Sequence, residues 1–214
     1  DEMTWLSVPE GEGLRERAAR RAERGLAGGQ NEFAALETQL RGAFGEAGRG
    51  GVVGGQDIGA EVPEGARAED YEDLDVYLAK VVELRGELDA ALGFGCARTS
   101  AMMARYPGGG AHYARHLDVA PGQAGERRRL TLVYYLNEGW APGDGGCLRA
   151  YLPPDVGPGV QGARRCSEDG LPEGSYVLDV EPLMDRLVVF ASGWLEHEVL
   201  PAHADRYAIT TWLY

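Results

Sequence analysis

The sequence has little of what marks secreted, membrane-spanning or zinc-finger proteins. Its three cysteines, Cys96, Cys147 and Cys166, lie far apart among 214 residues. They provide neither the paired spacing of a structural zinc site nor the density of a disulfide-stabilised domain. No apolar run reaches the roughly 18 residues of a membrane span, and the acidic first residues lack the basic and apolar regions of a signal peptide. We therefore expect no membrane partner and a reducing compartment, the cytoplasm or the nucleus.

Positive charge is also scarce. The chain has 34 acidic and 21 basic residues, which gives a formal net charge of −13. Proteins that bind the phosphate backbone of nucleic acids concentrate lysine and arginine on one face, and neither half of this chain is basic. Nucleic acid is therefore not expected as a partner. Hydrophobic residues make up 44% of the chain and charged residues 26%, as is typical of a folded globular domain.

Isoleucine is nearly absent, whereas glycine and proline are abundant. Ile58 and Ile209 are the two isoleucines, against 32 glycines and 11 prolines, a composition that favours turns and short strands over long helices. The glycine-rich acidic stretch 48–68 lacks the residues to pack a core, and two short helical patches precede it. We interpret residues 9–70 as an insertion in a single domain that spans 1–214 and has its core at 98–214.

One helix and eight strands are predicted in the rest of the chain. At 70–92, leucine and valine recur at three- and four-residue steps, acids occupy the first turn, and Gly93 follows the end. Short segments with period-two character then alternate with turns at 99–106, 111–118, 129–137, 147–153, 175–182, 185–192, 197–202 and 206–214. This pattern predicts a mainly β (α+β) fold, a double-stranded β-helix or jelly roll with supporting helices packed on one sheet.

All four histidines lie in the second half of the chain. His116 and Asp118 are two residues apart, so in a strand their side chains share a face and can bind one ion. His197 begins a later segment, and antiparallel jelly-roll topology commonly brings such distant strands together. Two histidines and one carboxylate leave open positions on a metal, as in non-haem Fe(II) oxygenases. His-x-Asp is a common tripeptide, however, so a metal site needs support from the rest of the segment.

Arg206 supplies that support. It opens the segment 206–214, in which Arg206, Thr210 and Trp212 share a face. A guanidinium there can hold a carboxylate with two parallel hydrogen bonds, and Thr210 can add a hydroxyl group. A dicarboxylate cosubstrate that binds the metal through its other end requires this combination.

Several ordered strings carry a family resemblance. They are MMARYPGGG, HYARHLD, LVYYLNEGW, GGCLRAY, DVEPLMDRLVVFAS and HEVLPAHADRYAITTWLY, with DEMTWL at the start. The sequence resembles the catalytic core of the Fe(II)- and 2-oxoglutarate-dependent prolyl 4-hydroxylases of the hypoxia-sensing type, which include the animal hypoxia-inducible factor prolyl hydroxylases and the protist Skp-adaptor prolyl hydroxylases. Collagen-type prolyl hydroxylases share the metal triad but typically use a lysine for the distal carboxylate, which disfavours that branch.

The resemblance implies a role for each matching residue. His116, Asp118 and His197 are the expected Fe(II) ligands, and Arg206 is the expected salt-bridge partner of 2-oxoglutarate. Further cosubstrate contacts are expected from Tyr106, Tyr135, Leu148 and Thr210, and substrate contacts near the mouth from Met102, Tyr113, Arg128 and Trp212.

Two further expectations concern the shape of this site. Tyr113 has the wrong parity to share a face with His116 in a regular strand, so a bulge or a strand end is needed there. An apolar pocket around Val189, Leu148 and Trp212 is expected to exclude bulk water.

The implied activity is trans-4-hydroxylation of a prolyl residue in a target protein, with Fe(II) as the metal, 2-oxoglutarate and O₂ as cosubstrates, and ascorbate as reductant. An oxygen-sensing role follows from the same resemblance. The glycine-rich insertion slightly favours a Skp-type ubiquitin-ligase adaptor as substrate. The alternatives are the hypoxia-inducible factor α subunit, elongation factor Tu, a non-prolyl substrate of the same chemistry, and a catalytically silent jelly-roll binding module.

Three departures from the family pattern bear on the substrate. The family has further elements before the DEMTWL-like string and after the TTWLY-like string, so these are expected to be deleted or to lie outside this sequence. Residues 9–70 replace a short connection, and the loop after Asp118 is longer than in the animal enzymes. Nothing in the sequence indicates an oligomeric state.

Overall fold

A computed structural model describes residues 2–6, 72–119 and 128–214. The predicted insertion at 9–70, with its helical patches and glycine-rich stretch, lies outside the described residues, as does most of the loop after Asp118. No helix of the described part is long and apolar enough to cross a membrane.

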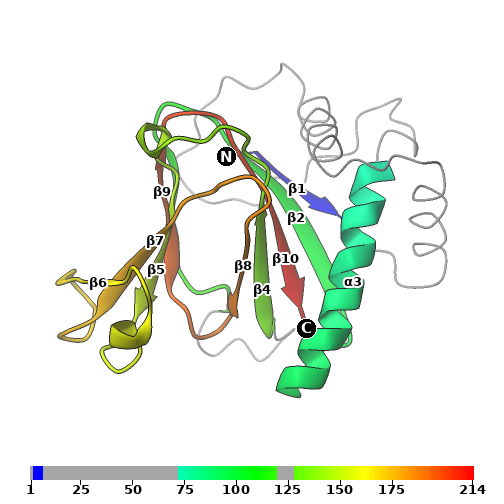
Figure 1. The fold of residues 1–214 in the computed structure, drawn as a ribbon, viewed down its shortest axis with the longest axis horizontal. Coiled ribbons are helices and arrows are strands. Elements are labelled where there is room, and N and C mark those ends of the chain that lie inside the picture. The colour runs from blue at the N-terminus through cyan, green and yellow to red at the C-terminus, as the bar shows by residue number, and fades with distance from the viewer. Residues whose placement is uncertain (1, 7–71, 120–127) are drawn as a thin grey trace.

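Two five-stranded antiparallel sheets face each other and form the body of the domain (Figure 1). The first sheet has the order β1-β2-β10-β4-β8, and the second has the order β3-β9-β5-β7-β6. The strands of the first sheet are β1 (Glu2–Leu6), β2 (Thr99–Tyr106), β10 (Arg206–Leu213), β4 (Leu130–Tyr135) and β8 (Leu187–Ala191). Those of the second are β3 (Ala111–His116), β9 (His197–Ala202), β5 (Leu148–Leu152), β7 (Tyr176–Val180) and β6 (Arg164–Arg165). The predicted two-sheet jelly-roll architecture is confirmed.

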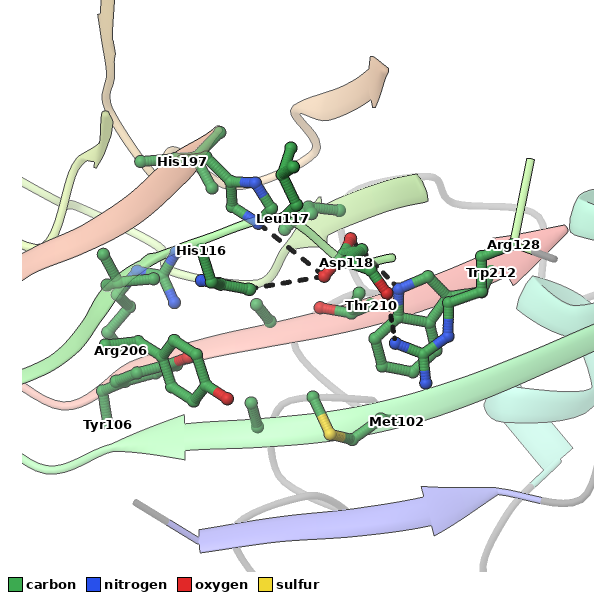
Figure 2. Close-up of a pocket in the computed structure, with 16 residues that line it drawn as sticks. Met102, Tyr106, His116, Leu117, Asp118, Arg128, His197, Arg206, Thr210 and Trp212 are labelled. Atoms are coloured by element: carbon green, nitrogen blue, oxygen red, sulfur yellow. Dashed lines mark hydrogen bonds and ion pairs between the residues drawn. The ribbon is translucent and has the colours of Figure 1, made fainter. Parts of the chain in front are cut away.

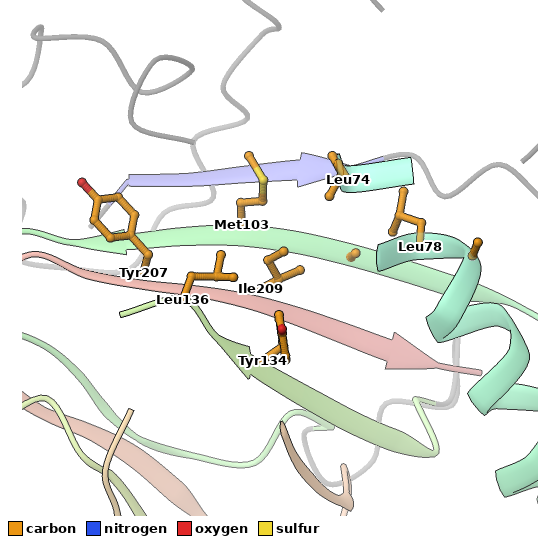
Figure 3. Packing of buried hydrophobic residues seen from close by; sticks show 9 residues of the cluster. Leu74, Leu78, Met103, Tyr134, Leu136, Tyr207 and Ile209 are labelled. Carbon is orange, nitrogen blue, oxygen red and sulfur yellow. The ribbon is translucent and has the colours of Figure 1, made fainter. Parts of the chain in front are cut away.

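The helix α3 (Glu72–Leu92) covers the outer face of the first sheet. Leu74 and Leu78 pack against Met103 of β2 and Ile209 of β10 (Figure 3). Ile209 is fully buried there. Because the other face of these strands forms part of the cavity described below, α3 holds the wall of the site in place.

All eight predicted strands are present, and β1 and β6 add to them. Several strands are shorter than predicted at their ends, because turn geometry begins early. Asp185, for example, has a φ of 63° and lies in the turn before β8, and β3 ends at His116, so that Asp118 follows the strand instead of belonging to it. The two-residue β6 is too short to show a period in the sequence.

Candidate active site

A cavity of about 280 Å³ lies between the two sheets. Eleven of the twelve predicted site residues line it, and the exception is Tyr135. The lining residues are Met102, Ala104, Tyr106, Tyr113, His116, Leu117, Asp118, Arg128, Val133, Leu148, His197, Val199, Arg206, Ala208, Thr210 and Trp212. Strands of both sheets therefore build one site, in agreement with the predicted meeting of distant strands.

The three predicted metal ligands converge at one point of the cavity (Figure 2). One donor atom from each of His116, Asp118 and His197 lies within 4.8 Å of the other two. Oδ1 of Asp118 is 3.4 Å from Nε2 of His116 and 3.9 Å from Nε2 of His197. The pairing of β3 with β9 places His116 directly opposite His197, which explains how residues far apart in the chain meet. Two nitrogen donors and one carboxylate oxygen fit Fe(II).

Backbone carbonyls set the orientation of both imidazoles. Nδ1 of His116 is 2.8 Å from the carbonyl oxygen of Ala114, and Nδ1 of His197 is 3.0 Å from that of Leu195. A carbonyl only accepts, so each Nδ1 carries the proton and donates it, which leaves Nε2 with a lone pair toward the metal position. Burial lowers the pKa of His197, which favours the neutral form that binds metals.

The second oxygen of Asp118 is held by two donors that face away from the histidines. Thr131 Oγ1 donates to Oδ2 at 2.5 Å and Trp212 Nε1 donates at 3.1 Å. Burial by itself raises the pKa of Asp118, but interactions with the two histidines, Thr131 and Trp212 outweigh it and lower the pKa to about 2. The carboxylate is therefore ionised and fixed, with Oδ1 free for a metal.

The predicted irregularity at Tyr113 is present in the structure. The register between β3 and β9 shifts between Tyr113 and His116, as a β-bulge does. As a result the Tyr113 ring lines the cavity and lies 4.6 Å from the His116 ring, centroid to centroid.

Arg206 is a buried cation with no carboxylate partner among the described residues. It is 1% exposed and lines the cavity on the opposite side of the triad from Arg128 and Trp212 (Figure 2). Its Nε donates to the carbonyl oxygen of Gly146 at 2.8 Å. A buried charge is costly unless it is paired, so this guanidinium indicates an anionic ligand in the cavity.

Two tyrosines flank the guanidinium. The Arg206 Cζ atom is 4.8 Å from the Tyr106 ring centroid and 5.1 Å from that of Tyr135. Burial raises the pKa of Tyr106 to about 12, although Arg206 partly offsets it, and burial also raises the pKa of Tyr135. Tyr135 is fully buried and does not line the cavity, although its ring lies against the guanidinium.

Arg128 and Trp212, two of the predicted substrate residues, lie on the other side of the triad from Arg206 (Figure 2). The Arg128 Cζ atom is 4.0 Å from the Trp212 ring centroid. Nη1 of Arg128 donates to the backbone carbonyl oxygen of Asp118 at 3.3 Å. Met102 lines the cavity from β2.

The expectation for Val189 is wrong. Val189 is 40% exposed, because Val188 and Phe190 face the core and the alternation of a strand turns the residue between them outward. Val133 and Leu148 provide the apolar lining instead.

Thr131 and Gly146 contact predicted site residues, and the sequence reasoning missed both. Thr131 alternates with Val133 and Tyr135 on the inward face of β4, and a hydroxyl among buried side chains signals a polar partner. Gly146 has a φ of 62°, and a Cβ atom there would lie 2.9 Å from Cδ of Arg206, a close approach that no pattern in the sequence reveals.

Comparisons with known proteins agree with this geometry. Residues 101–214 match the sequence family described as the 2OG-Fe(II) oxygenase superfamily. The chain is 40% identical over 120 residues to the human prolyl hydroxylase EGLN3, covering 55% of this chain and 41% of that one. It is 37% identical over 118 residues to the Caenorhabditis elegans hypoxia-inducible factor prolyl hydroxylase, covering 54% of this chain and 13% of the relative. The chain thus spans less than half the length of these curated relatives.

Solved structures show the same relationship. A Pseudomonas putida prolyl-4-hydroxylase superposes with a TM-score of 0.53 at 39% identity, covering 66% of this chain and 65% of that one. A Trichoplax adhaerens prolyl hydroxylase, solved with a hypoxia inducible factor peptide, gives a TM-score of 0.56 at 23% identity over 99% of this chain and 83% of that one, which supports the fold alone. With the family match over more than half of its length, this chain belongs to the 2OG-Fe(II) oxygenase superfamily.

Proposed function

We propose that this protein is a prolyl 4-hydroxylase that uses Fe(II), 2-oxoglutarate and O₂ to hydroxylate a proline in a target protein. The observation that carries the proposal is the placement of two features in one cavity. They are the His116, Asp118 and His197 triad and the buried Arg206, which has no carboxylate partner within the described ranges. A 2-oxo acid with a distal carboxylate matches both, since one end can bind a metal and the other end an arginine.

Each group of residues has a separate task in this function. The two imidazoles and Asp118 hold the metal, while Thr131 and Trp212 keep the carboxylate in place. Arg206, with the Tyr135 ring centroid 5.1 Å from its Cζ atom, binds the distal carboxylate and so orients the cosubstrate, and Thr210 lines the same cavity. Bound Fe(II) supplies redox chemistry that couples oxidative decarboxylation of 2-oxoglutarate to hydroxylation of a carbon. The apolar walls at Val133 and Leu148 exclude bulk water from that chemistry.

The proline substrate is supported by the relatives, whose names describe prolyl hydroxylases. Among possible targets we propose a Skp-type ubiquitin-ligase adaptor, because residues 9–70 are unlike a compact animal or bacterial enzyme. An oxygen-sensing role, ascorbate as reductant and a cytoplasmic or nuclear location are parts of the same proposal.

The test is incubation of the protein with Fe(II), 2-oxoglutarate and each of three candidates: a Skp-type adaptor, hypoxia-inducible factor α and elongation factor Tu. We expect succinate and a proline product about 16 Da heavier by mass spectrometry, corresponding to one added oxygen. If another candidate is hydroxylated and the adaptor is not, the adaptor is wrong as the proposed substrate, whereas the proposed prolyl hydroxylase activity stands. Succinate formation without product on any of the three would contradict these substrates, and neither succinate nor product would favour a silent binding module.

A further inference from the structure

The turn between β8 and β9, residues 192–196, is bonded to the segments that carry the metal triad. Ser192 Oγ lies 2.8 Å from Thr131 Oγ1, which in turn donates to Asp118. The Ser192 backbone N–H donates to the carbonyl oxygen of Arg129 at 3.1 Å. The turn is therefore tied to the segments that border the metal site, although none of its residues lines the cavity.

The next residues of the turn lie beside the segment that leaves Asp118. A Cβ atom at Gly193 would be 3.7 Å from Cβ of Val119, which directly follows Asp118. The strand registers place the end of β8, the start of β4 and the end of β10 together, with Leu130 opposite both Ala191 and Leu213. Figure 1 shows β8, β4 and β10 reaching the same end of the sheets. The turn thus lies at the Arg128 and Trp212 end of the site, away from the buried Arg206.

Trp194 points outward from this turn. Its indole is 54% exposed, the highest exposure among the large hydrophobic side chains of the described part, whereas the adjacent Leu195 is 7% exposed and packs in the core. The backbone N–H groups of Trp194 and Leu195 both donate to the carbonyl oxygen of Ala191, at 3.1 and 3.2 Å. These bonds fix the turn, so the outward position of Trp194 follows from a defined backbone conformation.

The size of the cavity shows where most of a protein substrate has to lie. About 280 Å³ is at or below the lower limit of cavities that enclose a drug-sized molecule. It has room for a small cosubstrate and one side chain but not for a polypeptide. The residues that flank a reacting proline must therefore lie on the surface around the cavity, and exposed tryptophans are frequent anchors in protein interfaces.

We propose that Trp194 is a substrate-binding residue that contacts apolar residues flanking the target proline of the protein substrate. This inference rests on the proposed function. Trp194 has no role in the chemistry itself, because its indole does not line the cavity that holds the metal ligands and the cosubstrate residues. Its contribution is apolar contact area and aromatic packing against the bound chain.

Leu187 provides a matched control. It lies on β8, the strand that leads into the turn with Trp194. It is also exposed, at 39%, and it pairs with Tyr134 at the far end of the strand from Ala191. Substituting Leu187 by alanine removes a comparable exposed hydrophobic side chain at the end of β8 that is remote from the turn with Trp194.

The experiment measures hydroxylation kinetics for Trp194→Ala, Trp194→Phe and Leu187→Ala on the candidate protein that the wild type hydroxylates. We expect Trp194→Ala to raise KM for the protein substrate roughly tenfold, with kcat and the KM for 2-oxoglutarate unchanged. Trp194→Phe keeps an aromatic ring and is expected to retain most of the affinity, and Leu187→Ala to behave as wild type. Equal melting temperatures establish that the variants are folded.

A binding measurement without turnover completes the test. Tryptophan emission of the Mn(II)-loaded enzyme is followed as the same protein substrate is added, and the emission change is expected to diminish in Trp194→Phe. Trp194→Ala with a wild-type KM would overturn the inference and leave the proposed function intact. A wild-type enzyme that hydroxylates none of the three candidates would instead overturn the proposed substrates, and the inference with them.

Discussion

Arg206 and Gly146 are joined by a hydrogen bond that fixes the guanidinium in the cavity. Nε of Arg206 donates to the Gly146 carbonyl oxygen at 2.8 Å, which leaves the two Nη groups to meet a carboxylate as a fork. Gly146 has no side chain in the way, and its φ of 62° is one that residues with a Cβ rarely adopt.

Substituting Gly146 by alanine is expected to raise KM for 2-oxoglutarate roughly tenfold, because the new Cβ would lie 2.9 Å from Arg206 Cδ and displace the guanidinium. Steady-state rates of succinate formation across a range of 2-oxoglutarate concentrations measure this KM. Gly143 is the control, since it lies in the same loop and a Cβ there meets nothing within 4 Å. An unchanged KM in Gly146→Ala would show that the site tolerates the displacement.

Substituting Arg206 by glutamine removes the buried positive charge. We expect 2-oxoglutarate binding to weaken roughly 30-fold or more, since a carboxylate in the cavity loses its ionic partner. Calorimetric titration of the Mn(II)-loaded enzyme checks this. Binding of 2-oxobutanoate, which lacks the distal carboxylate, should change little. An equal loss for both acids would mean that Arg206 supports the cavity wall and does not bind the carboxylate.

Substituting Thr131 by valine removes the hydroxyl group that donates a hydrogen bond to Asp118, while the side-chain volume stays nearly constant. Because groups that orient a metal ligand affect metal affinity by roughly 10- to 100-fold, the variant is expected to bind Mn(II) about tenfold more weakly. Isothermal titration calorimetry with Mn(II) measures the metal affinity of each variant. Ser192→Ala is the control, because Ser192 bonds Thr131 and has no bond to Asp118. Similar losses in both variants would point to general loosening of this region.

Substituting His116 by alanine is expected to abolish iron-dependent succinate formation, since two ligands remain of the three. Chelation of the metal in the wild type should have the same result, and added Fe(II) should restore only the wild type. Turnover that persists in His116→Ala would refute the proposed metal centre.

Asp179 links fold stability to pH. It accepts hydrogen bonds from Arg149 at 2.7 and 2.9 Å and from Arg164 at 2.6 Å, and the Arg149 bonds in particular lower its pKa. The stabilisation is complete above the ordinary aspartate pKa of about 4 and is lost as pH falls through the lowered pKa. Asp179→Asn is therefore expected to lower the free energy of unfolding by about 1 kcal/mol near neutral pH.

Urea unfolding of wild type and Asp179→Asn at several pH values measures this effect. The difference between the two proteins should shrink in acid, since the wild-type carboxyl group becomes protonated. A difference that stays constant down to about pH 2 would show that the ionised carboxylate is not its cause.

The sequence by itself determined the local elements and the chemistry that the chain can offer. Segments with alternating apolar residues predicted eight strands, and apolar residues at three- and four-residue spacing predicted the helix α3. The types and spacing of the side chains indicated His116, Asp118 and Arg206 as site residues. These patterns are local because they reflect which residues one strand or helix turns toward the core.

Only the tertiary structure decided how those elements combine into a site. The register of β3 with β9 places His197 opposite His116, and the shift in that register brings Tyr113 to the cavity. Thr131 meets Asp118, and Gly146 meets Arg206, across long stretches of chain. Trp194 is exposed while its neighbour Leu195 is buried. The physical reason is that strand register and close packing depend on distant partners, which periodicity along one segment does not encode.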